Sequence, residues 1–134
     1  MYAIDNISIF PILEKENTIK QDSKISLDTV HVKTFHFDLG KAGTDVDLSS
    51  ILEKLHSDDV EQILVIGHTD NTGDEELNQD LSYKRALYIS SEIKQRTNIE
   101  ISYTGESYYE PVSKNIQSKN RRVEVYFIKK LNQD

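Results

Sequence analysis

An arginine interrupts the apolar face of the longest predicted helix, and this residue limits how the chain can fold more than any other. The spacing of apolar residues, at about 100° per residue, predicts a helix over residues 75–96. Arg85 projects from the middle of its apolar half. That half carries Leu77, Leu81, Ala86, Tyr88, Ile89 and Ile93. Because burying an unpaired guanidinium costs several kcal/mol, we expect Arg85 to meet an acidic partner.

Asp70 is the acid of this chain best placed to meet Arg85. It lies in the glycine-flanked segment Gly67–Gly73, between a predicted strand and the long helix, where α/β sheets often present ligand-binding groups. Asn78 and Ser82 share the helix stripe of Arg85. An acid and a base held apart in an open crevice form a receptor for a zwitterion. The same two residues also fit an internal salt bridge without a ligand, and their spacing leaves both interpretations open.

Composition and charge narrow the class of protein. With 134 residues the chain suits one domain with a single core, and the absence of cysteine excludes disulfides and thiolate zinc sites. A net charge of −7 argues against a nucleic-acid partner, which needs a basic face. No apolar run reaches the ~20 residues that span a bilayer, so we expect no membrane contact by the domain itself. Met1 starts no basic-plus-apolar leader, so any export segment is expected elsewhere.

The order of predicted elements indicates the fold. They are a strand over 30–37, a helix over 48–55 that Asp45 or Asp47 can cap, a strand over 63–66 buried on both faces, the helix over 75–96, and strands over 99–103 and 122–128. This β-α-β-α-β-β order predicts an α/β (α+β) sandwich, a mixed sheet with helices covering one face. Residues 1–28 are predicted to be an extension or linker with at most one strand, and residues 29–134 to be the domain.

A few other groups of residues resemble catalytic or metal sites. His68 and Asp70 form an H-x-D pair of the kind seen in metal-dependent hydrolases, but a metal would need two or more further ligands. The segment after Asp70 departs from a calcium-binding loop at its sixth and twelfth positions. Ser82 and Ser107 have no His-Asp companions nearby in the sequence. We therefore expect no metal, no cofactor and no enzymatic activity.

The same residues carry a resemblance to a known family. The matching motifs are Gly67–Gly73 (GHTDNTG), Asn78, Leu81-Ser82, Arg85-Ala86, Gly105-Glu106-Ser107, Pro111 and Asn120–Glu124 (NRRVE). Together, from about Phe35 to Phe127, they resemble the OmpA-like C-terminal domain. This domain is the peptidoglycan-binding module of outer-membrane porins, peptidoglycan-associated lipoproteins and flagellar stator subunits. The sequence departs from the family at Gly40, where many members have asparagine, and at Tyr103, where a glycine is frequent.

The resemblance implies a ligand and the residues that hold it. The ligand is diaminopimelate of the peptidoglycan stem peptide, whose free end is an amino-acid zwitterion. Asp70 is implied to accept its ammonium group, and Arg85 to bind its carboxylate. The polar shell would be completed by Asn78, Thr72, Arg121 and the backbone around Asn71. Because Arg121 and Arg122 point to opposite faces of a strand, at most one of them reaches the crevice.

The resemblance also implies a place in the cell. Such a domain anchors a larger envelope or secretion complex to the cell wall from the periplasm. Its parent is held in the outer membrane, by a lipid or in the inner membrane. Because some relatives dimerise, a homodimer is compatible with the family. The alternative is a protein-protein adaptor in which the pair of Asp70 and Arg85 is purely structural.

Overall fold

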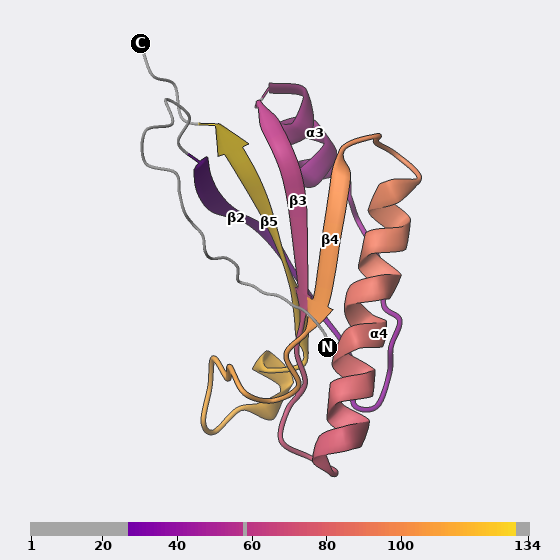
Figure 1. Ribbon diagram of the computed structural model, residues 1–134. Coiled ribbons are helices and arrows are strands. Elements are labelled where there is room, and N and C mark those ends of the chain that lie inside the picture. Colours follow the sequence, from indigo (N-terminus) through magenta and orange to yellow (C-terminus); the bar gives the residue numbers. More distant parts are fainter. Residues whose placement is uncertain (1–26, 58, 131–134) are drawn as a thin grey trace. The chain divides into compact units, whose positions relative to one another are not determined.

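The computed structural model describes residues 27–57 and 59–130. Their elements, in chain order, are β2 (Leu27–His36), α3 (Ser49–Ser57), β3 (Val60–Gly67), α4 (Glu75–Lys94), β4 (Glu100–Gly105), the 3-10 helix η1 (Gln117–Lys119) and β5 (Arg122–Lys130) (Figure 1). The predicted β-α-β-α-β-β order is confirmed, and η1 is the one described element that it lacks. The predicted extension falls outside the described residues, except for the first two residues of β2.

The strands form one mixed sheet in the order β2-β5-β3-β4. β3 and β4 are parallel, with Val65 opposite Tyr103, whereas β3 and β5 are antiparallel, with Val65 opposite Val125. The helix α4 connects the two parallel strands, as the crossover of a βαβ unit does. Asp28–Lys130 forms one compact unit that contains the whole sheet apart from Leu27. No described helix has both the length and the apolar character needed to cross a membrane.

The core lies where α3 and α4 pack on the sheet. Its buried residues are Phe35, Phe37, Leu48, Ile51, Ile63, Val65, Ala86, Ile89, Ile93, Val123, Val125 and Phe127. The prediction that β3 is buried on both faces is wrong. Ile63, Val65 and Gly67 are buried, but Leu64 and Ile66, which alternate with them, are only half-buried. The core formed with α3 and α4 takes up only alternate residues of the strand, so β3 follows the period of two expected for one covered face.

The buried stripe of α4 changes character along the helix. Up to Arg85 the inward side chains are polar or charged, and beyond it they are apolar apart from Ser90. The buried residues are Asn78, Ser82, Arg85, Ala86, Ile89, Ser90 and Ile93. The prediction that Leu77 belongs to this face is wrong, because Leu77 lies in the first turn, one position off this stripe, and is 64% exposed. One helix therefore contributes to both the apolar core and a polar cluster beside it.

Two glycines allow the polar half of α4 to approach the sheet closely. A Cβ atom at Gly67, the last residue of β3, would overlap the backbone carbonyl of Ser82, and one at Gly105 would overlap the Ser82 side chain and the Tyr83 backbone. These contacts set the helix directly against the ends of β3 and β4. The segment that follows Gly67 therefore leaves the sheet beside the inward-facing side chains of α4.

Candidate ligand-binding site

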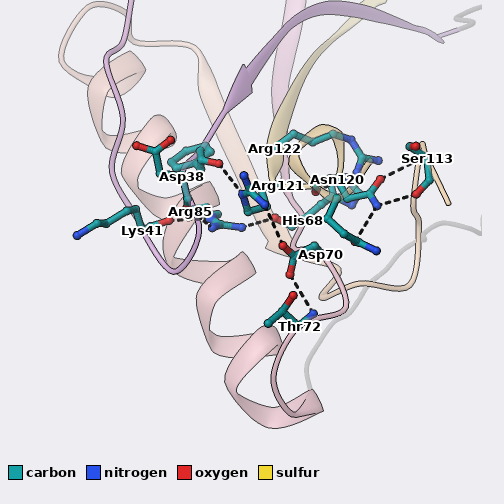
Figure 2. A network of polar contacts seen from close by, with 12 residues as sticks. Asp38, Lys41, His68, Asp70, Thr72, Arg85, Ser113, Asn120, Arg121 and Arg122 are labelled. Atoms are coloured by element: carbon teal, nitrogen blue, oxygen red, sulfur yellow. Dashed lines mark hydrogen bonds and ion pairs between the residues drawn. The ribbon is translucent and has the colours of Figure 1, made fainter. Parts of the chain in front are cut away.

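Arg85 is completely buried, as the sequence predicted, and its guanidinium has three oxygen partners (Figure 2). Nε donates to the carbonyl of Lys41 at 2.7 Å, Nη1 to that of His68 at 2.9 Å, and Nη2 to that of Asp38 at 3.1 Å. Its Cζ lies 5.2 Å from the centre of the Phe37 ring, within the range of a cation-π contact. The guanidinium is thus held by three main-chain oxygens and an aromatic face.

The expected direct ion pair between Arg85 and Asp70 is wrong. Three carbonyl dipoles already satisfy the buried guanidinium, so it needs no carboxylate in contact. The pKa of Arg85 is lowered to about 10, mainly by burial and also by the charge of Arg121, while the charge of Asp70 works in the opposite direction. The guanidinium therefore remains charged at neutral pH, and Asp70 acts on it through space. The structural Asp70/Arg85 pair of the adaptor alternative is likewise not formed.

Asp70 binds Arg121 in place of Arg85. Its Oδ2 lies 3.1 Å from Arg121 Nη1, and its Oδ1 accepts the backbone N–H of Thr72 at 3.0 Å. Arg121 is fixed in turn, because its Nε donates to the carbonyl of Phe37 at 2.9 Å. Burial raises the pKa of Asp70, but the hydrogen bonds from Thr72 and Arg121 outweigh it, so that this pKa lies below its ordinary value. Asp70 is therefore an ionised acceptor.

The expected open crevice is closed in this structure. Arg85 is 0% and Asp70 only 4% exposed. The turn Asp38–Lys41, between β2 and α3, lies against the guanidinium, and its four residues are exposed to solvent (Figure 2). A surface groove of about 670 Å³ is lined by Asp74, Glu75, Glu76, Gln79 and Tyr109, and so does not include Arg85. Access to the guanidinium requires part of the chain to move.

The other predicted site residues divide into buried and exposed groups. Asn78 is 4% exposed, and its Nδ2 has no hydrogen-bond partner within the described residues. Thr72 and Asn71 are exposed in the loop next to Asp70. Ser82, on the stripe of Arg85, has a structural role, because its hydroxyl accepts the backbone N–H of Ser107 at 2.9 Å. Among the residues of the predicted polar shell, Asn78 thus offers a buried donor. Thr72 and Asn71 face solvent at the edge of the site.

A second buried arginine was not recognised from the sequence. Arg122 donates to Glu124 and to the carbonyl of Glu110, each at 2.8 Å. Glu124 also accepts the hydroxyl of Tyr126 at 2.7 Å, and His68 Nε2 lies 3.5 Å from it, longer than a good hydrogen bond. His68, Arg122 and Tyr126 together hold the pKa of Glu124 far below its usual range against the effect of burial.

This network separates the roles of the two adjacent arginines. Arg121 reaches Asp70, whereas Arg122 reaches Glu124, as the prediction of opposite faces for Arg121 and Arg122 required. The alternation of side chains along a strand could have revealed Arg122. If Arg121 faces Asp70, Arg122 faces the other way and must find an acceptor there. Within residues 27–57 and 59–130, no cluster of three or more His, Cys, Asp or Glu side chains is arranged to hold a metal ion.

Comparisons with known proteins agree with this fold. The OmpA family matches residues 36–122 of the chain. The outer-membrane lipoprotein YfiB of Pseudomonas aeruginosa is 36% identical over 86 residues, which are 58% of this chain and 50% of that protein. The chain thus spans about half the length of this curated relative.

Two solved structures have a similar fold. The OmpA-like domain of FopA1 from Francisella tularensis has a TM-score of 0.64 at 23% identity, with 86% of this chain and 81% of that chain covered. The cell wall anchor of the type VI secretion system from Pseudomonas aeruginosa has a TM-score of 0.59 at 24% identity, with 79% and 88% covered. A mixed sheet of this topology, with its two helices, is that of an OmpA-like domain. The chain belongs to the OmpA family, because the family match covers well over half of its length.

Proposed function

We propose that this domain binds peptidoglycan without catalysis, through the zwitterionic end of diaminopimelate in the stem peptide. Asp70 takes the ligand ammonium and Arg85 its carboxylate. The observation that carries the proposal is that an ionised carboxylate and a buried guanidinium lie near each other at the end of β3 in a chain of the OmpA family. Each has the charge opposite to one end of the ligand.

The neighbouring residues support the same ligand. Nδ2 of Asn78 is a buried donor without a partner within the described residues, as suits a group that meets a carboxylate. Arg121 lies at Asp70 and can contact the anionic part of the ligand. Thr72 and Asn71 place a hydroxyl and backbone N–H groups at the exposed rim. These residues together form the polar shell of the proposed site.

Binding of this kind would anchor a larger assembly to the cell wall in the periplasm. The similar structure from Pseudomonas aeruginosa is described as a cell wall anchor, and YfiB as an outer-membrane lipoprotein. The proposal assigns the anchoring role to the present domain. Its partners are then peptidoglycan and the envelope or secretion complex of its parent protein, with a homodimer as a further proposed state.

Co-sedimentation with purified sacculi tests the proposed site. Asp70→Asn removes the negative charge without changing shape, and Arg85→Lys keeps the positive charge but loses the planar fork. We expect each variant to lower binding at least about tenfold, because each loses a charge-assisted contact to the ligand. The matched controls are Asp80→Asn and Lys84→Met. Each removes one partner of the exposed 2.9 Å ion pair between Asp80 and Lys84 on α4, the helix that carries Arg85, and should leave binding unchanged.

The chemistry of the wall tests the ligand itself. Sacculi that carry lysine in place of diaminopimelate lack the side-chain carboxylate that Arg85 is proposed to bind, so we expect them to bind at least about tenfold more weakly. Equal binding to both kinds of sacculi would contradict diaminopimelate as the ligand. Full binding by folded Asp70→Asn and Arg85→Lys would contradict the site.

A further inference from the structure

The turn Asp38–Lys41 occupies the side of Arg85 that a ligand carboxylate would need. Nε and Nη2 are neighbouring donors of the guanidinium, and guanidinium groups bind carboxylates bidentately through such a pair. In this structure Nε donates to the carbonyl of Lys41 and Nη2 to that of Asp38. Both acceptors belong to the same short turn. A carboxylate that binds this edge of Arg85 must therefore displace the turn.

The segments on either side of the turn are anchored independently. Before it, the backbone N–H of Phe37 donates to the carbonyl of Arg121 at 2.9 Å. After it, the hydroxyl of Tyr88 donates to the carbonyl of Thr44 at 2.9 Å. Because these anchors do not involve the turn or Arg85, they can persist when the turn moves. They limit the motion to the few residues between them.

The turn itself has few contacts that hold it down. Its internal bond runs from the N–H of Lys41 to the carbonyl of Asp38 at 3.0 Å, and within the described residues Arg85 alone bonds it to the rest of the fold. Leu39 is 60% exposed. Gly40 has φ +71, and its missing Cβ would meet nothing within 4 Å. The closed turn thus depends on Arg85 and on a backbone conformation that favours glycine.

We propose that the turn Asp38–Lys41 is a latch, which Arg85 holds shut in the ligand-free protein and which the carboxylate of the ligand opens. The proposal rests on the proposed function. Opening exchanges two neutral carbonyl acceptors for one charged carboxylate, and charge-assisted hydrogen bonds are the stronger kind. A ligand with an ammonium group but no carboxylate can reach Asp70 and leave the latch shut. The latch therefore makes binding depend on the carboxylate.

Nuclear magnetic resonance on the full chain tests this mechanism. The probe is meso-diaminopimelate, and the matched control ligand is cadaverine, a diamine of the same carbon spacing without carboxylates. We expect diaminopimelate to shift the Arg85 Nε–H signal together with the backbone amides of Gly40 and Lys41, because the bond of Arg85 to the turn is lost and the backbone of the turn moves. Cadaverine should leave these signals in place. A shift of Arg85 with unchanged Gly40 and Lys41 amides would overturn the latch.

A variant of the turn provides a second test. Gly40→Ala strains the closed turn through its positive φ without a steric clash, so the open form should be more populated. Because apparent affinity scales with the competent fraction, we expect diaminopimelate to bind about fivefold more tightly. The control is Gly43→Ala, whose Cβ would make ordinary contact with the Tyr88 ring at 3.5 Å and should not change affinity.

The outcomes separate the latch from the proposed function. Unchanged or weaker binding by Gly40→Ala would overturn the latch while diaminopimelate binding stands. If diaminopimelate moves neither the Arg85 signal nor that of the Asp70 carboxyl group in the wild-type protein, the proposed ligand is wrong and the latch has no role.

Discussion

Asp70 and Arg85 are two buried charges that lie near each other without forming an ion pair. Arg85 is bonded to carbonyl oxygens alone, and Asp70 to Arg121 and the backbone of Thr72. Neutral carbonyl partners leave the positive charge of Arg85 uncompensated by any carboxylate in contact. In the proposed function, the ligand carboxylate would supply that compensation.

The lowered pKa of Asp70 predicts how this residue contributes to stability at different pH. A carboxyl group whose pKa lies below its unfolded value of about 3.8 stabilises the fold above that value, and the contribution is lost as the pH falls through the folded pKa. Asp70→Asn should therefore be less stable than wild type by a constant amount above about pH 5, and by a shrinking amount below about pH 4. Urea unfolding at a series of pH values measures this difference.

The control for this prediction is Asp80→Asn. Asp80 is exposed in a surface ion pair with Lys84, where salt and solvent screen the interaction, so the substitution should change stability little at any pH. A difference between wild type and Asp70→Asn that stays constant down to pH 2.5 would show that the Asp70 carboxylate is not stabilised by its neighbours.

At the level of single residues, the sequence predicted which way a side chain points better than which atoms it bonds. The helical period of α4 correctly turned Arg85 inward, because that depends only on local geometry. Its acceptors could not be predicted, since the carbonyls of Lys41 and Asp38 lie 44 and 47 residues away in the chain. Any residue type has a carbonyl, so no sequence pattern marks such a partner. The expectation of an acidic partner therefore paired Arg85 with Asp70, although its acceptors are carbonyl oxygens.

At the level of elements, the position of the site depends on how closely α4 approaches the end of β3. Gly67 begins the glycine-flanked segment of the sequence, but in the structure it is the last residue of β3 and allows the Ser82 backbone to pack on it. Hydrophobic periodicity predicted both elements and roughly their bounds. It also placed Asn78 and Ser82 on the stripe of Arg85, where both are buried although their side chains have the composition of an exposed surface.

Gly67→Ala tests this close packing. The added methyl group would overlap the carbonyl of Ser82, which belongs to the helix backbone and cannot rotate away as a side chain does. We expect a loss of about 1–3 kcal/mol in the free energy of unfolding, the usual cost of overpacking. Urea unfolding measures it, and the control is Gly43→Ala, whose Cβ would make only an ordinary contact with the Tyr88 ring. A loss below about 0.5 kcal/mol would show that α4 shifts freely on the sheet.

At the level of the whole molecule, the described residues contain everything that the proposed site requires. The site residues come from the turn after β2, the loop after β3, α4 and the residue that directly precedes β5. All of these lie within Asp28–Lys130, as does the apolar core. A net charge of −7 over the chain also means that the anionic end of a ligand is attracted by Arg85 and Arg121 locally and not by the overall field.

This concentration of core and site predicts that a fragment of residues 27–130 folds and binds by itself. The fragment keeps the four strands, both helices and each residue proposed to contact the ligand. We expect it to unfold cooperatively, with a thermal midpoint within about 4 °C of the full chain, a change worth about 1 kcal/mol or less in a domain of this size. Its affinity for diaminopimelate and for sacculi should match that of the full chain. Calorimetry and co-sedimentation of both proteins in parallel measure these quantities. A much lower midpoint, or loss of binding by the folded fragment, would show that residues outside 27–130 complete the core or the site.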